Sequence, residues 1–190
     1  ADFDQDGRID LYLGRWWYQD LLLLNEGGGR FSVHGRDVGI IEQVWPSGYD
    51  RQDGQRTPDV GSENTMGLNV GDLDANGSPD VVIGTGDPTR ANPAIILCAE
   101  PDAVTRVRFH RCSEPVRSGN GLSRGHGSTI GDVNHDGALD LVVNPGGFPP
   151  YDAANHTDTR ESPKVYLGVP SGTSARLRLR VGAHPRAAVG

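Results

Sequence analysis

Long apolar stretches and aromatic residues are scarce in this sequence of 190 residues. Aromatic side chains make up 6% of the chain, and no apolar run approaches the roughly 18 residues that a membrane-spanning helix needs. The sequence therefore predicts a soluble protein without a membrane span.

Cysteine is scarce as well, because only Cys98 and Cys112 occur. Two cysteines are too few for a disulfide scaffold, and they show no C-x-x-C or haem-attachment spacing. The chain starts at Ala1 without an initiator methionine or a signal-peptide pattern, which favours a mature or trimmed segment.

Glycine and proline are abundant, with 27 and 13 copies. This content is typical of many tight turns between short strands. Two longer stretches rich in Gly, Pro, Asp and Asn, residues 35–64 and 145–162, are predicted to be surface loops.

One pattern, D-x-[DN]-x-[DN]-G-x-x-D followed by an apolar residue, occurs three times. We call residues 2–10, 72–80 and 132–140 the first, second and third loop; they start 70 and then 60 residues apart. A short run, residues 67–71 or 127–131, precedes the second and third copies. Each copy is followed by a short run of β-forming residues and then by two further apolar runs. A repeat of about 60 residues with four antiparallel strands is propeller-blade architecture.

The predicted fold is therefore all-β, with about three four-stranded antiparallel blades that form part of a larger propeller. We expect blades over about residues 1–34, 66–112 and 126–181. Three blades cannot close a ring, because closed propellers have about 4–8 blades. The outermost blades should then expose apolar sheet surface and pack against further blades of the same protein or against other subunits.

Oxygen atoms at alternate positions of a tight loop can converge on one hard cation, and Ca²⁺ takes about 6–8 of them. Positions 1, 3, 5 and 9 of each loop supply side-chain oxygens, the glycine at position 6 permits the turn, and position 7 offers its carbonyl. The expected ligands of about three Ca²⁺ ions are Asp2, Asp4, Asp6, Arg8 and Asp10 in the first loop, Asp72, Asp74, Asn76, Ser78 and Asp80 in the second, and Asp132, Asn134, Asp136, Ala138 and Asp140 in the third.

The loops do not fit two other interpretations, an EF-hand and a simple hairpin turn. An EF-hand needs a glutamate at position 12 and flanking helices, but position 12 is Leu13, Ile83 or Val143 within a β-type run. A hairpin turn needs one Asp-Gly pair rather than four acidic or amide positions packed together. Metal binding is therefore favoured over both.

The net charge of −7 fits this interpretation. Ten aspartates lie in the three loops, and three Ca²⁺ ions would change the net charge from −7 to about −1 (−7 + 6). The acidity is then mainly a metal-binding feature, and a nucleic-acid partner is not expected.

The loops and the strands expected after them resemble FG-GAP/VCBS repeats, the calcium-binding blades of integrin-α-like propellers. Residues 24–31 are similar to the L-x-N-x-G-x-G-x-F hairpin of bacterial VCBS proteins. Residues 125–127 and 182–190 look like parts of proteins that end in an ASPIC/UnbV module, the cartilage acidic protein group, and residues 182–190 would begin that module. The resemblance implies a secreted or surface-exposed protein that works through binding and calcium-dependent rigidity.

No catalytic constellation is evident in the sequence, which has no G-x-S-x-G, no phosphate loop and no carboxylate pair outside the loops. The expected function is a non-catalytic extracellular module for protein–protein or protein–glycan interaction; the alternative is a propeller fragment of a carbohydrate-active enzyme such as a polysaccharide lyase. Trp16, Trp17 and Tyr18 could stack on a sugar or pack within a blade. Asn155 begins a glycosylation sequon.

Cys98 and Cys112 lie on the last two strands expected in the second blade. A disulfide across that hairpin suits an extracellular, cell-surface or periplasmic location, which calcium loops also favour. Two separate buried thiols are the other interpretation.

Overall fold

The computed structural model describes residues 1–15, 19–40, 65–85, 94–112, 127–144, 164–168 and 179–181. Trp16–Tyr18, Asn155 and residues 125–126 and 182–190 lie outside the described residues, so the hypotheses that concern them remain sequence-based.

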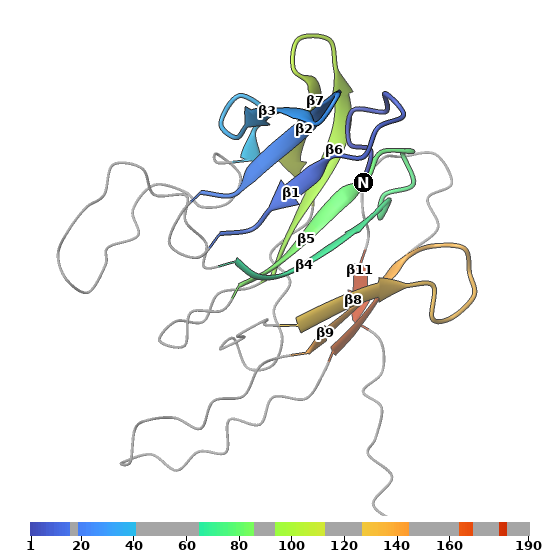
Figure 1. The fold of residues 1–190 in the computed structure, drawn as a ribbon. Helices are drawn as coiled ribbons and strands as arrows, with labels where there is room; N and C mark the ends of the chain where they lie inside the picture. The colour runs from blue at the N-terminus through green and yellow to red at the C-terminus, as the bar shows by residue number, and fades with distance from the viewer. Residues whose placement is uncertain are drawn as a thin grey trace, which may run out of the picture.

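The eleven described elements are all β-strands and form three antiparallel sheets (Figure 1). Sheet 1 contains β1 (Leu11–Leu13), β2 (Leu21–Gly27) and β3 (Arg30–His34). Sheet 2 contains β4 (Thr65–Gly71), β5 (Asp80–Thr85), β6 (Ile95–Asp102) and β7 (Arg106–Arg111). Sheet 3 contains β8 (Gly127–Gly131), β9 (Asp140–Asn144), β10 (Lys164–Gly168) and β11 (Leu179–Val181).

Within each sheet, strands that follow one another in the sequence are neighbours. The all-β fold of antiparallel, blade-like units expected from the sequence is thus confirmed. Sheet 1 has three described strands rather than four.

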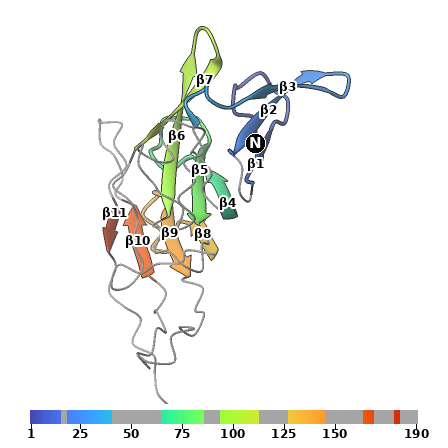
Figure 2. The ribbon, with the colours of Figure 1, turned by 90° about the vertical axis from the view of Figure 1, so that its left-hand side faces the viewer.

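The three sheets stack in sequence order, so sheet 2 is covered on both faces (Figure 2). The first core lies between sheets 1 and 2 and consists of Phe3, Leu22, Leu24, Val38, Ile40, Val81, Ile83, Ile95, Leu97, Ala99, Val107 and Phe109. The second core lies between sheets 2 and 3 and consists of Leu73, Val82, Ala94, Ile96, Leu141, Val143 and Tyr166.

This stacking explains why residues 81–83 of β5 and 95–99 of β6 are apolar without interruption. Side chains alternate between the two faces of a strand, and both faces of sheet 2 need apolar side chains. Val81 and Ile83 enter the first core, whereas Val82, between them, enters the second. All three are fully buried.

The segment after β3 differs from the surface loop that was expected from residue 35 onward. Val38 and Ile40 are 0% and 1% exposed and belong to the first core. Phe109 N donates a hydrogen bond to Val38 O at 2.8 Å, which ties the segment to β7. The expectation was wrong at Val38 and Ile40, because these apolar side chains are buried in the core, whereas Arg36 and Asp37 are exposed as expected.

Within the part of the chain described above, there is no helix with the length and apolar character required to cross a bilayer.

Candidate calcium loops

All three loops have the same backbone conformation. The residue at position 4 has positive φ in each copy, 58° at Gln5, 58° at Ala75 and 60° at His135. The glycine at position 6 has φ of 86°, 88° and 88° in the three loops. A non-glycine residue seldom adopts such a φ, so its recurrence at one position shows that the pattern encodes one specific turn.

The aspartate at position 1 closes this turn. Asp2 accepts hydrogen bonds from Asp6 N at 3.0 Å and from Gly7 N at 2.9 Å. The second and third loops repeat both bonds with the same distances, through Asp72 and Asp132. The side-chain oxygen at position 5 accepts from the N–H at position 7 in each loop.

The aspartate at position 9 is buried and connects its loop to the second strand that follows it. Asp10, Asp80 and Asp140 are at most 1% exposed. One carboxylate oxygen of each accepts a bond from the N–H at position 2 of its own loop, at 2.7–2.8 Å. The other oxygen accepts a bond from β2, β6 or β10, donated by Asn25 N at 2.8 Å, Ala99 N at 2.9 Å and Gly168 N at 2.8 Å.

The predicted ligands converge to different degrees. In the first loop, one oxygen each of Asp2, Asp4 and Asp10 lies within 4.8 Å of the others. In the second loop, Asp74 and Asp80 form such a group with Cys98 Sγ, but Cys98 is in a disulfide and does not act as a thiolate ligand. In the third loop, no such group of three is present among the described side chains.

Burial and mutual repulsion disfavour ionisation of several loop carboxylates. Burial raises the pKa of Asp80 to about 7, and the charge of Asp74 adds to the increase against opposing hydrogen bonds from Ala99 N and Leu73 N. Burial also raises the pKa of Asp74, with a further increase from Asp72. A bound cation would stabilise the ionised forms and reverse these shifts.

The side chain of Asp4 is enclosed within the first loop. Its side chain is 0% exposed, and Oδ2 accepts no hydrogen bond from the described residues. Burial raises the pKa of Asp4, and the charges of Asp10 and Asp6 raise it further. The donor set is made of oxygen atoms, which suits a hard divalent cation such as Ca²⁺. The residues therefore fit the ion that the sequence predicts.

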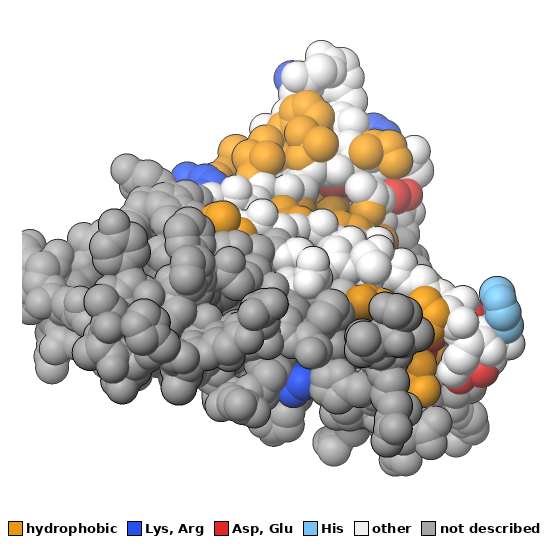
Figure 3. Space-filling model, turned by 90° about the horizontal axis from the view of Figure 1, so that it is seen from below, with side chains coloured by type: hydrophobic (Ala, Val, Ile, Leu, Met, Phe, Trp, Pro, Cys, Tyr) orange, Lys and Arg blue, Asp and Glu red, His pale blue; other side chains and the backbone are white. Residues whose placement is uncertain are grey.

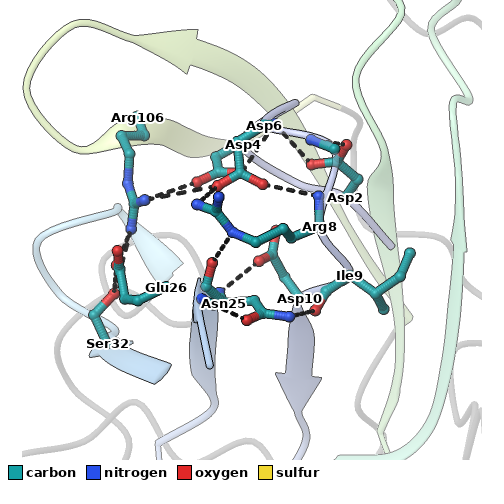
Figure 4. A network of polar contacts seen from close by, with 12 residues as sticks. Asp2, Asp4, Asp6, Arg8, Ile9, Asp10, Asn25, Glu26, Ser32 and Arg106 are labelled. Carbon is teal, nitrogen blue, oxygen red and sulfur yellow. Dashed lines mark hydrogen bonds and ion pairs between the residues drawn. The ribbon is translucent and has the colours of Figure 1, made fainter. Parts of the chain in front are cut away.

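A guanidinium group from sheet 2 lies against this loop (Figure 4). Arg106 Nη1 is 3.1 Å from Asp4 Oδ2 and 4.0 Å from Asp6 Oδ2, while its Nη2 donates to Glu26 Oε1 at 2.6 Å. The guanidinium group of Arg8 also pairs with the Asp6 carboxylate. The positive charge of Arg106 lowers the pKa of Asp4, in opposition to burial.

Sequence reasoning did not identify Arg106 or Glu26, because they are 80 residues apart in the chain and no pattern connects them. It expected the position-7 carbonyl of Arg8 as a ligand, whereas the observed contacts of Arg8 come from its N–H and its side chain.

Neighbouring loops are in direct contact. Gln5 Nε2 donates hydrogen bonds to Gly77 O at 3.2 Å and to Ser78 Oγ at 3.0 Å. The first and second loops therefore lie at the same end of the stacked sheets.

Cys98 on β6 and Cys112, which follows β7, form a disulfide with their Cα atoms 5.5 Å apart. The disulfide joins strands that are already paired, and Cys98 is fully buried beside the second loop.

A comparison with protein-family models finds no match for this chain, and a comparison with curated proteins finds none. The resemblance to FG-GAP/VCBS repeats therefore rests on the residues of the loops and hairpins and stays a prediction.

Proposed function

We propose that this chain is a calcium-stabilised, non-catalytic module of a β-propeller type, which serves binding and assembly outside the cytosol. The loops hold about three Ca²⁺ ions, and the bound ions make the sheets rigid. The partners are further blades or subunits of a larger assembly, and the ligand class is a surface protein or a glycan.

One observation carries the proposal: the same turn occurs three times and concentrates carboxylates at one end of each sheet. Asp4, Asp74 and Asp80 have raised pKa values there, with burial as the largest cause. Without a cation, these ionised groups oppose folding. A divalent cation removes that cost, so the loops are better explained as ion sites than as simple turns.

The disulfide supports the proposed location. Disulfides persist in oxidising compartments such as the extracellular space and the bacterial periplasm. Calcium is also abundant enough outside the cytosol to fill weak sites.

The experiment is thermal unfolding of the 190-residue chain in excess Ca²⁺, in Mg²⁺ and in strong chelator. Ca²⁺ should raise the melting temperature, because binding to the folded state alone contributes about 2.7 kcal/mol per site at a hundredfold excess over Kd. Mg²⁺ should raise it much less, since it tolerates a crowded multi-oxygen site poorly.

Matched variants locate the effect. Asp136→Ala removes a third-loop carboxylate and should reduce the calcium-induced rise in melting temperature. Glu100→Ala removes an exposed carboxylate outside the loops and should leave it unchanged. Identical melting curves in Ca²⁺ and in chelator would refute the calcium role.

A further inference from the structure

Sheet 1 has an exposed apolar face. Leu11 and Leu13 on β1 are 45% and 39% exposed, and Phe31 and Val33 on β3 are 39% and 62% exposed. The strand register places them on one face with Leu21 and Leu23 of β2, because Leu11 pairs with Leu23, Leu13 with Leu21, and Val33 with Leu23. Figure 3 shows hydrophobic side chains gathered on one projecting part of the molecule.

The same face is buried in the other two sheets. The residues one and three positions after the last loop aspartate are Leu11 and Leu13 in sheet 1, Val81 and Ile83 in sheet 2, and Leu141 and Val143 in sheet 3. In sheets 2 and 3 these side chains are 0–1% exposed.

The last strand of the hairpin shows the same contrast between sheets 1 and 2. Phe31 pairs with Asn25, and Phe109 pairs with Ala99, where Asn25 and Ala99 are the equivalent residues that donate to the position-9 aspartate. Phe109 is 1% exposed, whereas Phe31 is 39% exposed. Sheet 1 therefore carries the side chains of a buried face, and none of the described sheets covers it.

The structure shows twice what covers this face. In the first core, Val81 and Ile83 pack with Leu22 and Leu24 from the opposite face of sheet 1. In the second core, Leu141 and Val143 pack with Val82 and Ile96 from the opposite face of sheet 2. Each sheet thus receives the opposite face of the sheet that precedes it.

The outer face of sheet 3, which points away from sheet 2, is equivalent to the faces of sheets 1 and 2 that cover the next sheet. Val142, Val165 and Leu167 occupy the positions of Val82, Ile96 and Cys98 in sheet 2, and they are only partly buried. Among the described sheets, the exposed face of sheet 1 therefore resembles the faces that are covered in sheets 2 and 3. The outer face of sheet 3 resembles the faces that cover them.

We propose that the exposed face of sheet 1 docks the outer face of sheet 3 from a second copy of this chain, which continues the sheet-on-sheet stacking between molecules. Such a contact is head-to-tail, so it uses two different surfaces and can close into a ring. The proposal deepens the assembly role given above and does not depend on calcium binding.

The first test measures self-association of the 190-residue chain by sedimentation velocity over a wide concentration range, with calcium present. We expect a concentration-dependent dimer. Val33→Asp puts a charge on the docking face and should weaken association at least about tenfold, because burial of an unpaired charge is costly. Val104→Asp is the matched control, since Val104 is 90% exposed in the turn between β6 and β7 and should leave association unchanged.

A complementation experiment tests the head-to-tail arrangement. Val165→Asp alters the outer face of sheet 3, and it should also weaken self-association. A mixture of the Val33→Asp and Val165→Asp chains should form heterodimers, because each supplies the face that the other has lost. Circular dichroism checks that each variant remains folded.

Three results would overturn the proposal. The first is a folded wild-type chain that stays monomeric at every concentration. The second is association that Val33→Asp leaves intact. The third is a dimer that Val165→Asp leaves intact, which would indicate pairing between two copies of sheet 1. A failure of calcium to change the melting temperature would refute the proposed ion binding but would not affect these results.

Discussion

The first and third loops have the same backbone but different surroundings. In the first loop the Asp4 side chain is fully buried, and the guanidinium groups of Arg106 and Arg8 lie against Asp4 and Asp6. In the third loop residues 133–137 are exposed, and none of the ion pairs among the described residues involves them. The pattern therefore specifies the turn, whereas neighbouring elements set the electrostatic environment of each site.

This comparison separates two functions within one motif. Position 9 is buried and makes the same two hydrogen bonds in both loops, so it is part of the fold. Positions 1, 3 and 5 carry the other proposed ion ligands, and their environment differs between the loops. Substitutions at position 9 should have equal effects in the two loops, and changes around positions 3 and 5 should have unequal effects.

The largest effect should come from position 9. Asp10→Ala and Asp140→Ala each leave two N–H groups without an acceptor. Because a buried donor without a partner costs about 1–3 kcal/mol, each variant should lose about 3 kcal/mol of unfolding free energy in urea titrations performed in chelator. A difference of several kcal/mol between the two variants would break the equivalence of the loops at this position.

An intermediate effect should come from Arg106→Ala. Its guanidinium group would compete with the proposed Ca²⁺ for Asp4, so its removal should increase the calcium affinity of the first loop by about three- to tenfold. In chelator the same variant should melt about 2–4 °C lower, because the buried Asp4 loses its only described cationic partner. Calorimetric titration and thermal melts measure the two effects.

Arg108→Ala is the control for this variant, because Arg108 is exposed on β7 and has no described ion pair with a loop carboxylate. It should change neither measurement. If Arg106→Ala leaves the calcium affinity unchanged, the charge of Arg106 does not affect ion binding at the first loop. The predicted electrostatic difference between the first and third loops would then be wrong.

The smallest effect should come from Asp20, a buried carboxylate that belongs to no loop. It accepts hydrogen bonds from Arg15 N and Thr65 Oγ1, but burial dominates and raises its pKa above the usual 3.8. The folded state therefore binds this proton more tightly than the unfolded state does. The stability that Asp20 contributes is fully present below pH 3.8 and is lost as the pH rises through the raised value.

Asp20→Asn should accordingly gain stability relative to the wild type as the pH increases from 4 toward 7, as measured by urea unfolding at each pH. The gain should be the same in Ca²⁺ and in chelator, because Asp20 is not a loop residue. A gain that disappears in calcium would connect Asp20 to the ion sites and weaken the distinction between fold and site carboxylates.

Much of the fold could be predicted from the sequence, because the loops and the runs after them are local signals. The Asp-Gly or Asn-Gly turn and the short apolar runs after it determine where β5, β6 and β9 lie without reference to distant residues. The burial of Val38 and Ile40 could not be predicted, since it depends on β7, about 70 residues later in the chain. The pairing of Arg106 with Asp4 depends likewise on how sheets 1 and 2 stack.

The hydrogen bond from the position-9 aspartate to β2, β6 or β10 has a consequence for how the repeat tolerates insertions. That bond joins residues 15 apart in sheet 1, 19 apart in sheet 2 and 28 apart in sheet 3. The length of the connection between the two bonded strands therefore varies by 13 residues (28 − 15) while the anchoring contact is the same. A strand that is aligned by a side chain does not need a turn of fixed length to set its register. The connections after β1, β5 and β9 are thus the natural places for insertions to accumulate in evolution and for foreign peptides to be grafted by design.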